Sequence, residues 1–126
     1  MNYSMNKNGF TGHLPFGKLE ISSNEEYGFR PYQLLVSSLA VCSGGVMRKV
    51  LDKMRMSAED IQIEVKDIVR NEEEADRVEK VHLHFIVTGD INEEKMPRVM
   101  ELTRKNCSMV QSVKDSIEII ETFEVR

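Results

Sequence analysis

The chain is predicted to fold as an α+β domain, because its apolar residues follow two different periods in separate segments. Apolar and polar residues alternate over 61–65 and again over 78–88, which is typical of strands with one wet face. From Pro31 onwards, apolar residues instead recur at helical spacing. Two more helices and a final strand are predicted after the second alternating segment, so helices and strands are mixed along the chain.

The first thirty residues are predicted to form a small β-meander. Glycine and proline break this segment repeatedly and leave candidate strands at 10–14 and 18–22. A long helix then begins at Pro31, a position where proline's missing N–H costs nothing. The first half of this helix is apolar or small all round, and its polar face appears only from Arg48 onwards. We therefore expect a long, buried central helix whose first half is buried on every side.

The rest of the chain is predicted to add a hairpin, two helices and a strand. The two alternating segments pair across an acidic turn at 71–76. Asn92 is a suitable N-cap for a helix over 93–105, with acids in its first turn and bases in its last, as the helix dipole prefers. A short helix follows from about Cys107, and 117–125 closes the chain as a strand. Residues 1–126 make up one domain's length.

Composition and charge exclude several classes of function. The chain has 126 residues, of which 40% are hydrophobic and 30% charged, as in soluble globular proteins. Its net charge of −4 offers no basic field for nucleic acid. No uninterrupted apolar run reaches the roughly 18 residues of a membrane span, and no apolar segment follows Lys7 as in a secretion signal. We expect a cytoplasmic protein that binds neither nucleic acid nor membrane, and whose small core gains from dimerisation.

Two cysteines carry the clearest chemistry in the sequence. Cys42 and Cys107 are 65 positions apart, and two thiols that meet in the fold can run a cycle of attack on an oxidant and disulfide formation. Gly44 and Gly45 follow Cys42, and each costs a helix about 1 kcal/mol, so a close backbone contact or room for a substrate is expected there. Cys107 in a first helical turn would gain thiolate character from the dipole. The alternative for both is a small buried residue in a packed core.

Histidines offer a second, weaker candidate site. His82 and His84 share one face of a predicted strand and, with His13, could suggest a metal. No cysteine or carboxylate stands at ligand spacing near them, and a solvated sheet face accounts for both residues. We therefore expect no metal and no other cofactor.

The two cysteine segments resemble the motifs of the osmotically inducible protein C and organic hydroperoxide resistance (OsmC/Ohr) family. The segment PYQLLVSSLAVC, which ends at Cys42, is similar to the family's Pro-Glu-Gln-Leu followed by a small-residue helix ending Ala-Ala-Cys. The segment Cys107-Ser108-Met109-Val110 is similar to its Cys-Pro and short helix, with Ser108 where proline is usual. The resemblance covers nearly the whole chain. It implies an OsmC-like fold and an intertwined homodimer with two active sites at the interface.

In the family's peroxidase members, the first cysteine attacks a hydroperoxide, the second resolves the sulfenic acid as a disulfide, and a dithiol restores both. On this resemblance Cys42 is the peroxidatic thiol and Cys107 the resolving one. The family's activating carboxylate, which holds an arginine from the N-terminal strands, falls at Tyr32. Arg30 and Lys18 are the candidate cations that remain. Without a cation near its sulfur, Cys42 in an apolar helix would keep a raised pKa.

Three functions are consistent with these residues. The first is a candidate enzyme, a cysteine-based peroxidase without haem or metal that reduces organic hydroperoxides with a dithiol, as an antioxidant in the stress response. The second is a non-catalytic OsmC-like domain that binds an apolar or thiol-bearing small molecule at the dimer cleft, which the loss of the carboxylate favours. The third is a redox sensor whose disulfide changes the stability of the dimer. The presence of both cysteines favours the peroxidase.

Overall fold

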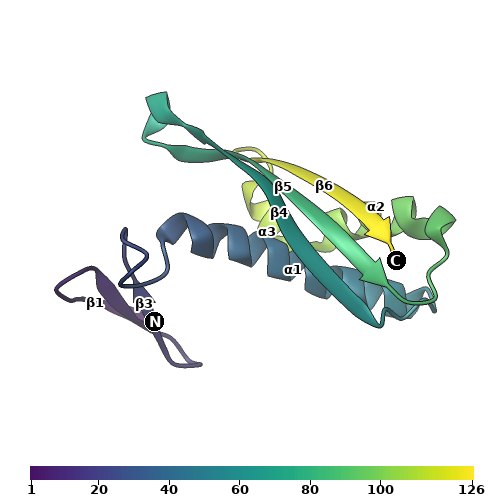
Figure 1. Cartoon of the computed structure of the whole chain (residues 1–126), viewed down its shortest axis with the longest axis horizontal. Coiled ribbons are helices and arrows are strands. Elements are labelled where there is room, and N and C mark those ends of the chain that lie inside the picture. The colour runs from purple at the N-terminus through teal and green to yellow at the C-terminus, as the bar shows by residue number, and fades with distance from the viewer. The chain divides into compact units, whose positions relative to one another are not determined.

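The computed structural model describes all 126 residues, and they form two compact units, Met1–Ser37 and Ser38–Arg126. Helix α1 (Pro31–Lys53) begins in the first unit and continues into the second. Strands and helices are mixed along the chain, as the sequence predicts, and the fold is of the α+β class (Figure 1).

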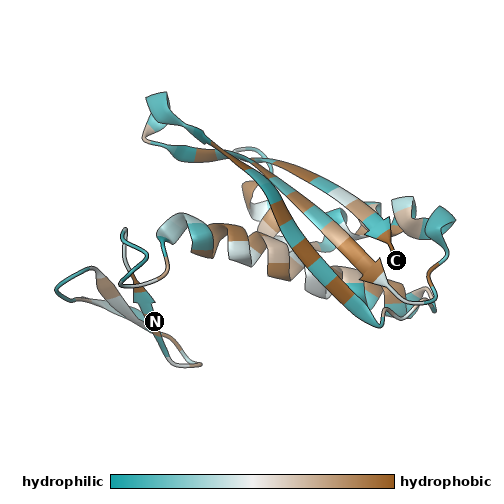
Figure 2. Ribbon diagram, viewed as in Figure 1, coloured by the Kyte–Doolittle hydropathy of each residue, from teal (hydrophilic) through white to brown (hydrophobic).

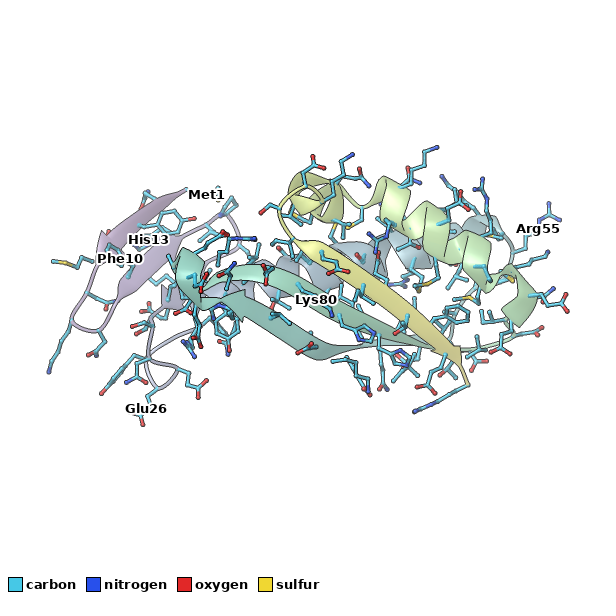
Figure 3. All side chains as sticks on the ribbon, turned by 90° about the horizontal axis from the view of Figure 1, so that it is seen from above. Met1, Phe10, His13, Glu26, Arg55 and Lys80 are labelled. Carbon is cyan, nitrogen blue, oxygen red and sulfur yellow. The ribbon has the colours of Figure 1, made fainter.

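The first unit contains a three-stranded antiparallel sheet. Its strands, in spatial order, are β1 (Asn2–Met5), β2 (Phe10–His13) and β3 (Lys18–Ile21). The latter two confirm the predicted strands, and the ends of β2 are marked by Phe10 and His13 in Figure 3. The sheet has no apolar core of its own, because large side chains including Tyr3, Phe10 and Phe16 are exposed.

Helix α1 begins at Pro31, as predicted, and is buried on one side. Leu39, Met47 and Leu51 are fully buried, whereas Val41 is 70% exposed. The side chains of α1 are therefore not buried on every side within one chain, although hydrophobic residues occur along much of the helix (Figure 2). The chain leaves the helix through Arg55, which adopts a left-handed backbone conformation with φ 60° (Figure 3).

By length and composition alone, α1 is also a candidate membrane span. Its most apolar window has a mean hydropathy of 1.5, because the serines and glycines that interrupt the apolar run carry no charge. The core helix of a soluble protein meets the same criterion, so this property does not separate the two cases.

The second unit contains a mixed three-stranded sheet with helices against it. Strands β4 (Asp60–Asn71) and β5 (Arg77–Thr88) form the predicted antiparallel hairpin, joined by a 3-10 turn at Glu72–Glu74. Strand β6 (Glu118–Val125) lies parallel to β5, so the sheet order is β4-β5-β6. A parallel neighbour needs a crossover connection, and the intervening helices supply it. They are α2 (Met96–Asn106) and α3 (Ser108–Val113).

The helix predicted over 93–105 is divided in two by a proline. Residues Glu93–Lys95 form a 3-10 turn, in which Asn92 accepts a hydrogen bond from the Glu94 N–H as predicted for a cap. The regular helix α2 starts only at Met96, directly before Pro97. Proline has no N–H to donate to the preceding turn, so the helix begins at the proline rather than before it.

The core of the second unit lies between this sheet and α1. The inward row of β5, namely Val81, Leu83, Phe85 and Val87, is fully buried, as its alternation predicts. Ile63 of β4 lies beside Phe85 and faces Gly44 of α1. A Cβ on Gly44 would lie 2.6 Å from the Cδ1 atom of Ile63, so the missing side chain lets helix and sheet approach closely. This contact fixes α1 two residues beyond Cys42.

A buried carboxylate lies where α2 meets β6. Glu121 follows the inward face of β6, opposite Leu83 of β5, and its side chain is only 4% exposed. The Nε of Arg104 on α2 lies 3.1 Å from Oε1 of Glu121, and the guanidinium also donates to the carbonyl oxygen of Ile119. Neither carboxylate oxygen accepts a hydrogen bond in good geometry. Burial therefore raises the pKa of Glu121, and Arg104 offsets this only in part.

We expect Glu121→Gln to raise the melting temperature at pH 7 by a few degrees, on the order of 1 kcal/mol. Since its folded pKa exceeds the ordinary value near 4.5, Glu121 favours folding below that pH and loses this contribution as pH rises through the folded pKa. The gain should therefore shrink at pH 4. Thermal denaturation at both pH values measures it, with exposed Glu118→Gln on the same strand as control. An equal gain at both pH values would contradict burial as the cause.

Candidate functional site

The two cysteines, distant in sequence, meet between α1 and the junction of α2 with α3. Cys42 lies in α1, and Cys107 is the single residue that ends α2 and caps α3. Both are free thiols, and they lie close enough for each to affect the pKa of the other. The fold thus brings together the pair from which a disulfide could form.

Each cysteine is accompanied by the serine that follows the other one. The Ser43 hydroxyl donates to the Cys107 sulfur at 3.3 Å, and the Ser108 oxygen lies 3.7 Å from the Cys42 sulfur. Cys107 and Ser43 are fully buried, whereas Cys42 is half-buried and Ser108 exposed. Only Cys42 of the two sulfurs is therefore open to a molecule that arrives from solvent.

The surroundings shift the two thiol pKa values in opposite directions. The pKa of Cys42 is lowered, chiefly by a hydrogen bond from the Met109 amide; burial opposes this, and the Cys107 thiol and Ser108 add to it. The pKa of Cys107 is raised, chiefly by burial and further by its position beside Cys42, with Ser43 in opposition. The pair therefore favours a thiolate on Cys42 and a proton on Cys107.

Two expectations from the sequence are wrong at this point. Cys42 was expected to keep a raised pKa without a cation, and Cys107 to gain from the start of the short helix. Cys107 instead precedes α3 as its cap, with an extended backbone (φ −84°, ψ 106°) and a buried sulfur. The first amides of α3, those of Ser108 and Met109, act on Cys42 across the helix boundary. The helix start thus lowers the pKa of the other cysteine.

The three residues predicted to activate Cys42 belong to the first unit. Lys18 is exposed on β3, and the Arg30 guanidinium lies 4.9 Å from the centre of the Tyr32 ring. None of them is among the groups that act on the Cys42 pKa. The structure therefore brings together the two cysteines, and the residues the sequence reasoning missed are Ser43 and Met109, with Ser108 noted only as a departure from the motif. The repeated Cys-Ser pair is the signal that could have found the two serines.

The histidines take part in hydrogen bonds on the outer face of the second sheet. His82 Nε2 and His84 Nδ1 lie 2.8 Å and 2.7 Å from the hydroxyl of Thr122, and His84 Nε2 lies 3.0 Å from a carboxylate oxygen of Glu124. Lys80 marks this face in Figure 3. No group of three potential metal ligands gathers there, and His13 lies in the first unit.

A cavity of about 430 Å³ opens along α1 close to Cys42. It is lined by Val41, Gly44, Gly45 and Arg48 on one face of the helix and by the start of β4. A Cβ on Gly45 would meet no atom within 4 Å, so this glycine faces open space, whereas Gly44 contacts Ile63. Gly44 thus makes a close contact, although with a side chain and not with the expected backbone, and Gly45 faces free space. Cys42 itself does not line this cavity.

The chain is similar to a known protein family and to several solved structures. A family model described as OsmC-like protein matches residues 23–122. No curated protein sequence matches significantly. Among solved structures, a hypothetical protein from Aquifex aeolicus VF5 is similar with a TM-score of 0.88 and 23% identity, over 99% of this chain and 93% of that one.

Two further solved structures are similar to this chain. An OsmC-like protein from Mycoplasma pneumoniae has a TM-score of 0.87 and 14% identity, over 98% of this chain and 94% of that chain. An organic hydroperoxide resistance protein from Legionella pneumophila, also described as a predicted redox protein, has a TM-score of 0.76 and 20% identity over the same shares. At these identities the likeness establishes the fold.

Proposed function

The chain belongs to the family of OsmC-like proteins, and on that premise we propose that it is a thiol peroxidase that reduces organic hydroperoxides. The observation that carries the proposal is the contact between two thiols with opposite pKa shifts, the accessible one lowered and the buried one raised. A peroxidase needs a thiolate where the oxidant arrives and a protonated partner beside it. Cys42 and Cys107 meet these two requirements.

The proposed cycle balances with a dithiol as reductant. The Cys42 thiolate attacks the outer oxygen of ROOH; an S–O bond forms, the O–O bond breaks, and the alkoxide RO⁻ leaves. Cys107 is the adjacent protonated group and gives its proton to RO⁻, which becomes ROH. The Cys107 thiolate then attacks the Cys42 sulfenic acid, releases hydroxide and forms the disulfide. A dithiol reduces the disulfide by exchange and is itself oxidised.

An organic rather than an inorganic peroxide is supported by the surroundings of Cys42. Val41, the preceding residue, is 70% exposed, and α1 borders a cavity along that face. An alkyl or aryl group could cover this apolar surface, whereas hydrogen peroxide has nothing to bury. A structural neighbour described as an organic hydroperoxide resistance protein agrees with this choice.

The proposal is tested by consumption of cumene hydroperoxide by the purified, reduced protein with a dithiol. We expect catalytic turnover, one cumyl alcohol per peroxide, and a Cys42–Cys107 disulfide when the dithiol is omitted. Hydrogen peroxide should react more slowly under the same conditions. If neither peroxide is consumed above the background of Cys42→Ser, the chain is a non-catalytic member of the family and the cavity beside α1 becomes the site to study.

We also propose that the functional form is a homodimer. The first unit exposes its aromatic side chains and has no core, and a three-stranded sheet of that kind needs a partner surface. Val41 and Gly45 leave a second open apolar face on α1, along which only 33% of the most apolar window is buried. A second copy of the chain could cover these surfaces, and the organic group of the peroxide would then lie between the two copies, at the edge of the face that carries Val41.

Sedimentation equilibrium tests the dimer. The wild-type protein should sediment at about 29 kDa, twice the chain mass of 14.5 kDa. Val41→Glu places a charge in the proposed interface, and we expect it to weaken association at least tenfold, because an unpaired buried charge costs several kcal/mol. Lys105→Glu, exposed on α2, is the control and should leave the mass unchanged. A wild-type mass of one chain would reject the proposal.

A further inference from the structure

We propose that Ser108 and Ser43 are positioning residues, one for each thiol. Ser108 stabilises the Cys42 thiolate, and Ser43 favours the Cys107 thiolate that attacks in the resolving step. The inference rests on the proposed peroxidase for its catalytic meaning. The hydrogen bonds themselves are independent of turnover, so they can be tested even in a protein that consumes no peroxide.

Ser108 places a hydroxyl and a backbone N–H beside Cys42, and a proline in its place would lack both. Its hydroxyl oxygen lies 3.7 Å from the Cys42 sulfur, and its backbone N–H also acts on that sulfur. When Cys42 is a thiolate, it has no proton, so the Ser108 hydroxyl must be the donor between the two side chains. Proline, usual at this position in the motif, has neither an N–H nor a hydroxyl. Serine at 108 therefore stabilises the thiolate without a charged side chain.

Ser43 acts on the buried partner. Its hydroxyl is fully buried and donates to the Cys107 sulfur at 3.3 Å. Burial chiefly keeps the proton on Cys107, and while Cys42 is a thiolate its charge adds to this effect. Once Cys42 has been oxidised to a neutral sulfenic acid this repulsion is gone, and the Ser43 donor then favours the Cys107 thiolate that must attack.

Apart from the Cys42 thiolate itself, the groups that most affect the pKa values of the two thiols are uncharged. The groups that act on the two sulfurs are each other, the hydroxyls of the two serines and the first amides of α3. On Cys42 these amides belong to Ser108 and Met109, and on Cys107 to Val110. Because hydroxyls do not titrate in the working range, a change at either serine should move the thiol it contacts without adding a titrating group.

The role of Ser108 is tested by a graded series of variants at that position. Iodoacetamide alkylation of the reduced protein, resolved by site with mass spectrometry from pH 5 to 10, reports the thiolate of each cysteine. At pH 7 we expect Ser108→Ala to slow alkylation of Cys42 roughly threefold to tenfold and Ser108→Pro to slow it further. Ser108→Thr, which keeps both donors on an exposed site, should match the wild type.

Ser112→Ala is the matched control for this series. Ser112 lies one turn further along α3, and its hydroxyl donates to the Ser108 carbonyl oxygen instead of a sulfur. It should leave the alkylation profile of Cys42 unchanged. Equal profiles for Ser108→Ala, Ser108→Pro and the wild type would overturn the role of Ser108, whether or not the protein is a peroxidase.

The role of Ser43 is tested with diamide, an oxidant that needs no peroxidase chemistry. The Cys42 thiolate adds to the N=N bond, and the Cys107 thiolate then attacks the Cys42 sulfur, forms the disulfide and displaces the hydrazine. Ser43→Ala should leave the first step within about twofold and prolong the Cys42 adduct severalfold in quenched samples. An adduct lifetime equal to that of the wild type would overturn the role of Ser43. Circular dichroism confirms that each variant is folded.

Discussion

Replacing Cys42 by serine is expected to abolish the turnover of cumene hydroperoxide, with a loss of roughly a thousandfold or more. The reason is the identity of the nucleophile, because only a thiolate attacks a peroxide O–O bond readily and a serine hydroxyl stays protonated at neutral pH. The Met109 amide lowers the pKa of the Cys42 thiol, whereas a serine hydroxyl in the same place would stay protonated at neutral pH. Peroxide consumption with a dithiol in excess measures the loss.

Cys107→Ser separates attack from resolution. This variant keeps the nucleophile, so one equivalent of peroxide per chain should still be consumed to form the Cys42 sulfenic acid, and a second equivalent should oxidise it to the sulfinic acid, which mass spectrometry detects. Turnover should fall because no intramolecular disulfide forms. If Cys42→Ser retained wild-type turnover, or if Cys107→Ser alone abolished the first equivalent, the roles of the two thiols would have to be exchanged or abandoned.

Phe85→Ala is expected to be the most damaging substitution outside the site, at about 3–5 kcal/mol of unfolding free energy. Phe85 is fully buried at the middle of β5, between Ile63 and Phe123 on the neighbouring strands. Its removal leaves a cavity under the contact between Ile63 and Gly44, which fixes α1. Since small domains are stable by about 5–15 kcal/mol in total, much of the stability would be lost.

Urea denaturation measures this loss, and Phe16→Ala provides the matched control. Phe16 is 94% exposed, so its removal should change the unfolding free energy by less than about 0.5 kcal/mol. A loss below about 1 kcal/mol for Phe85→Ala would contradict the central position of this side chain.

Much of the fold could be predicted because periodicity is a local property. The hairpin of β4 and β5, the start of α1 at Pro31 and the last strand were all visible as patterns of apolar residues. The short strand β1 was missed because its four residues are too few to establish a period, and because the strand depends on pairing with β2. The parallel placement of β6 beside β5 is non-local, and no pattern within 117–125 distinguishes it from an antiparallel strand.

The two cysteines of the candidate site could be predicted from the sequence, but the directions of their pKa shifts could not. The cysteine pair follows from the sequence, and the fold brings the thiols together. The direction of each pKa shift does not follow, because it depends on which sulfur the first amides of α3 face. That is decided by the extended backbone of Cys107, a single residue between two helices. A helix start read from sequence was assigned to the wrong thiol.

The sixty-four residues between Cys42 and Cys107 give the thiol pair a thermodynamic consequence as well as a chemical one. They include the whole β4–β5 hairpin and α2, so a disulfide would tie the long helix to the junction of α2 and α3 within the crossover connection. Closing a loop of that length reduces the entropy of the unfolded chain and stabilises the folded one by about 4 kcal/mol in the chain-entropy treatment. Each catalytic cycle would then convert the chain between a disulfide-bonded form and a dithiol form, and the disulfide-bonded form would resist unfolding more strongly.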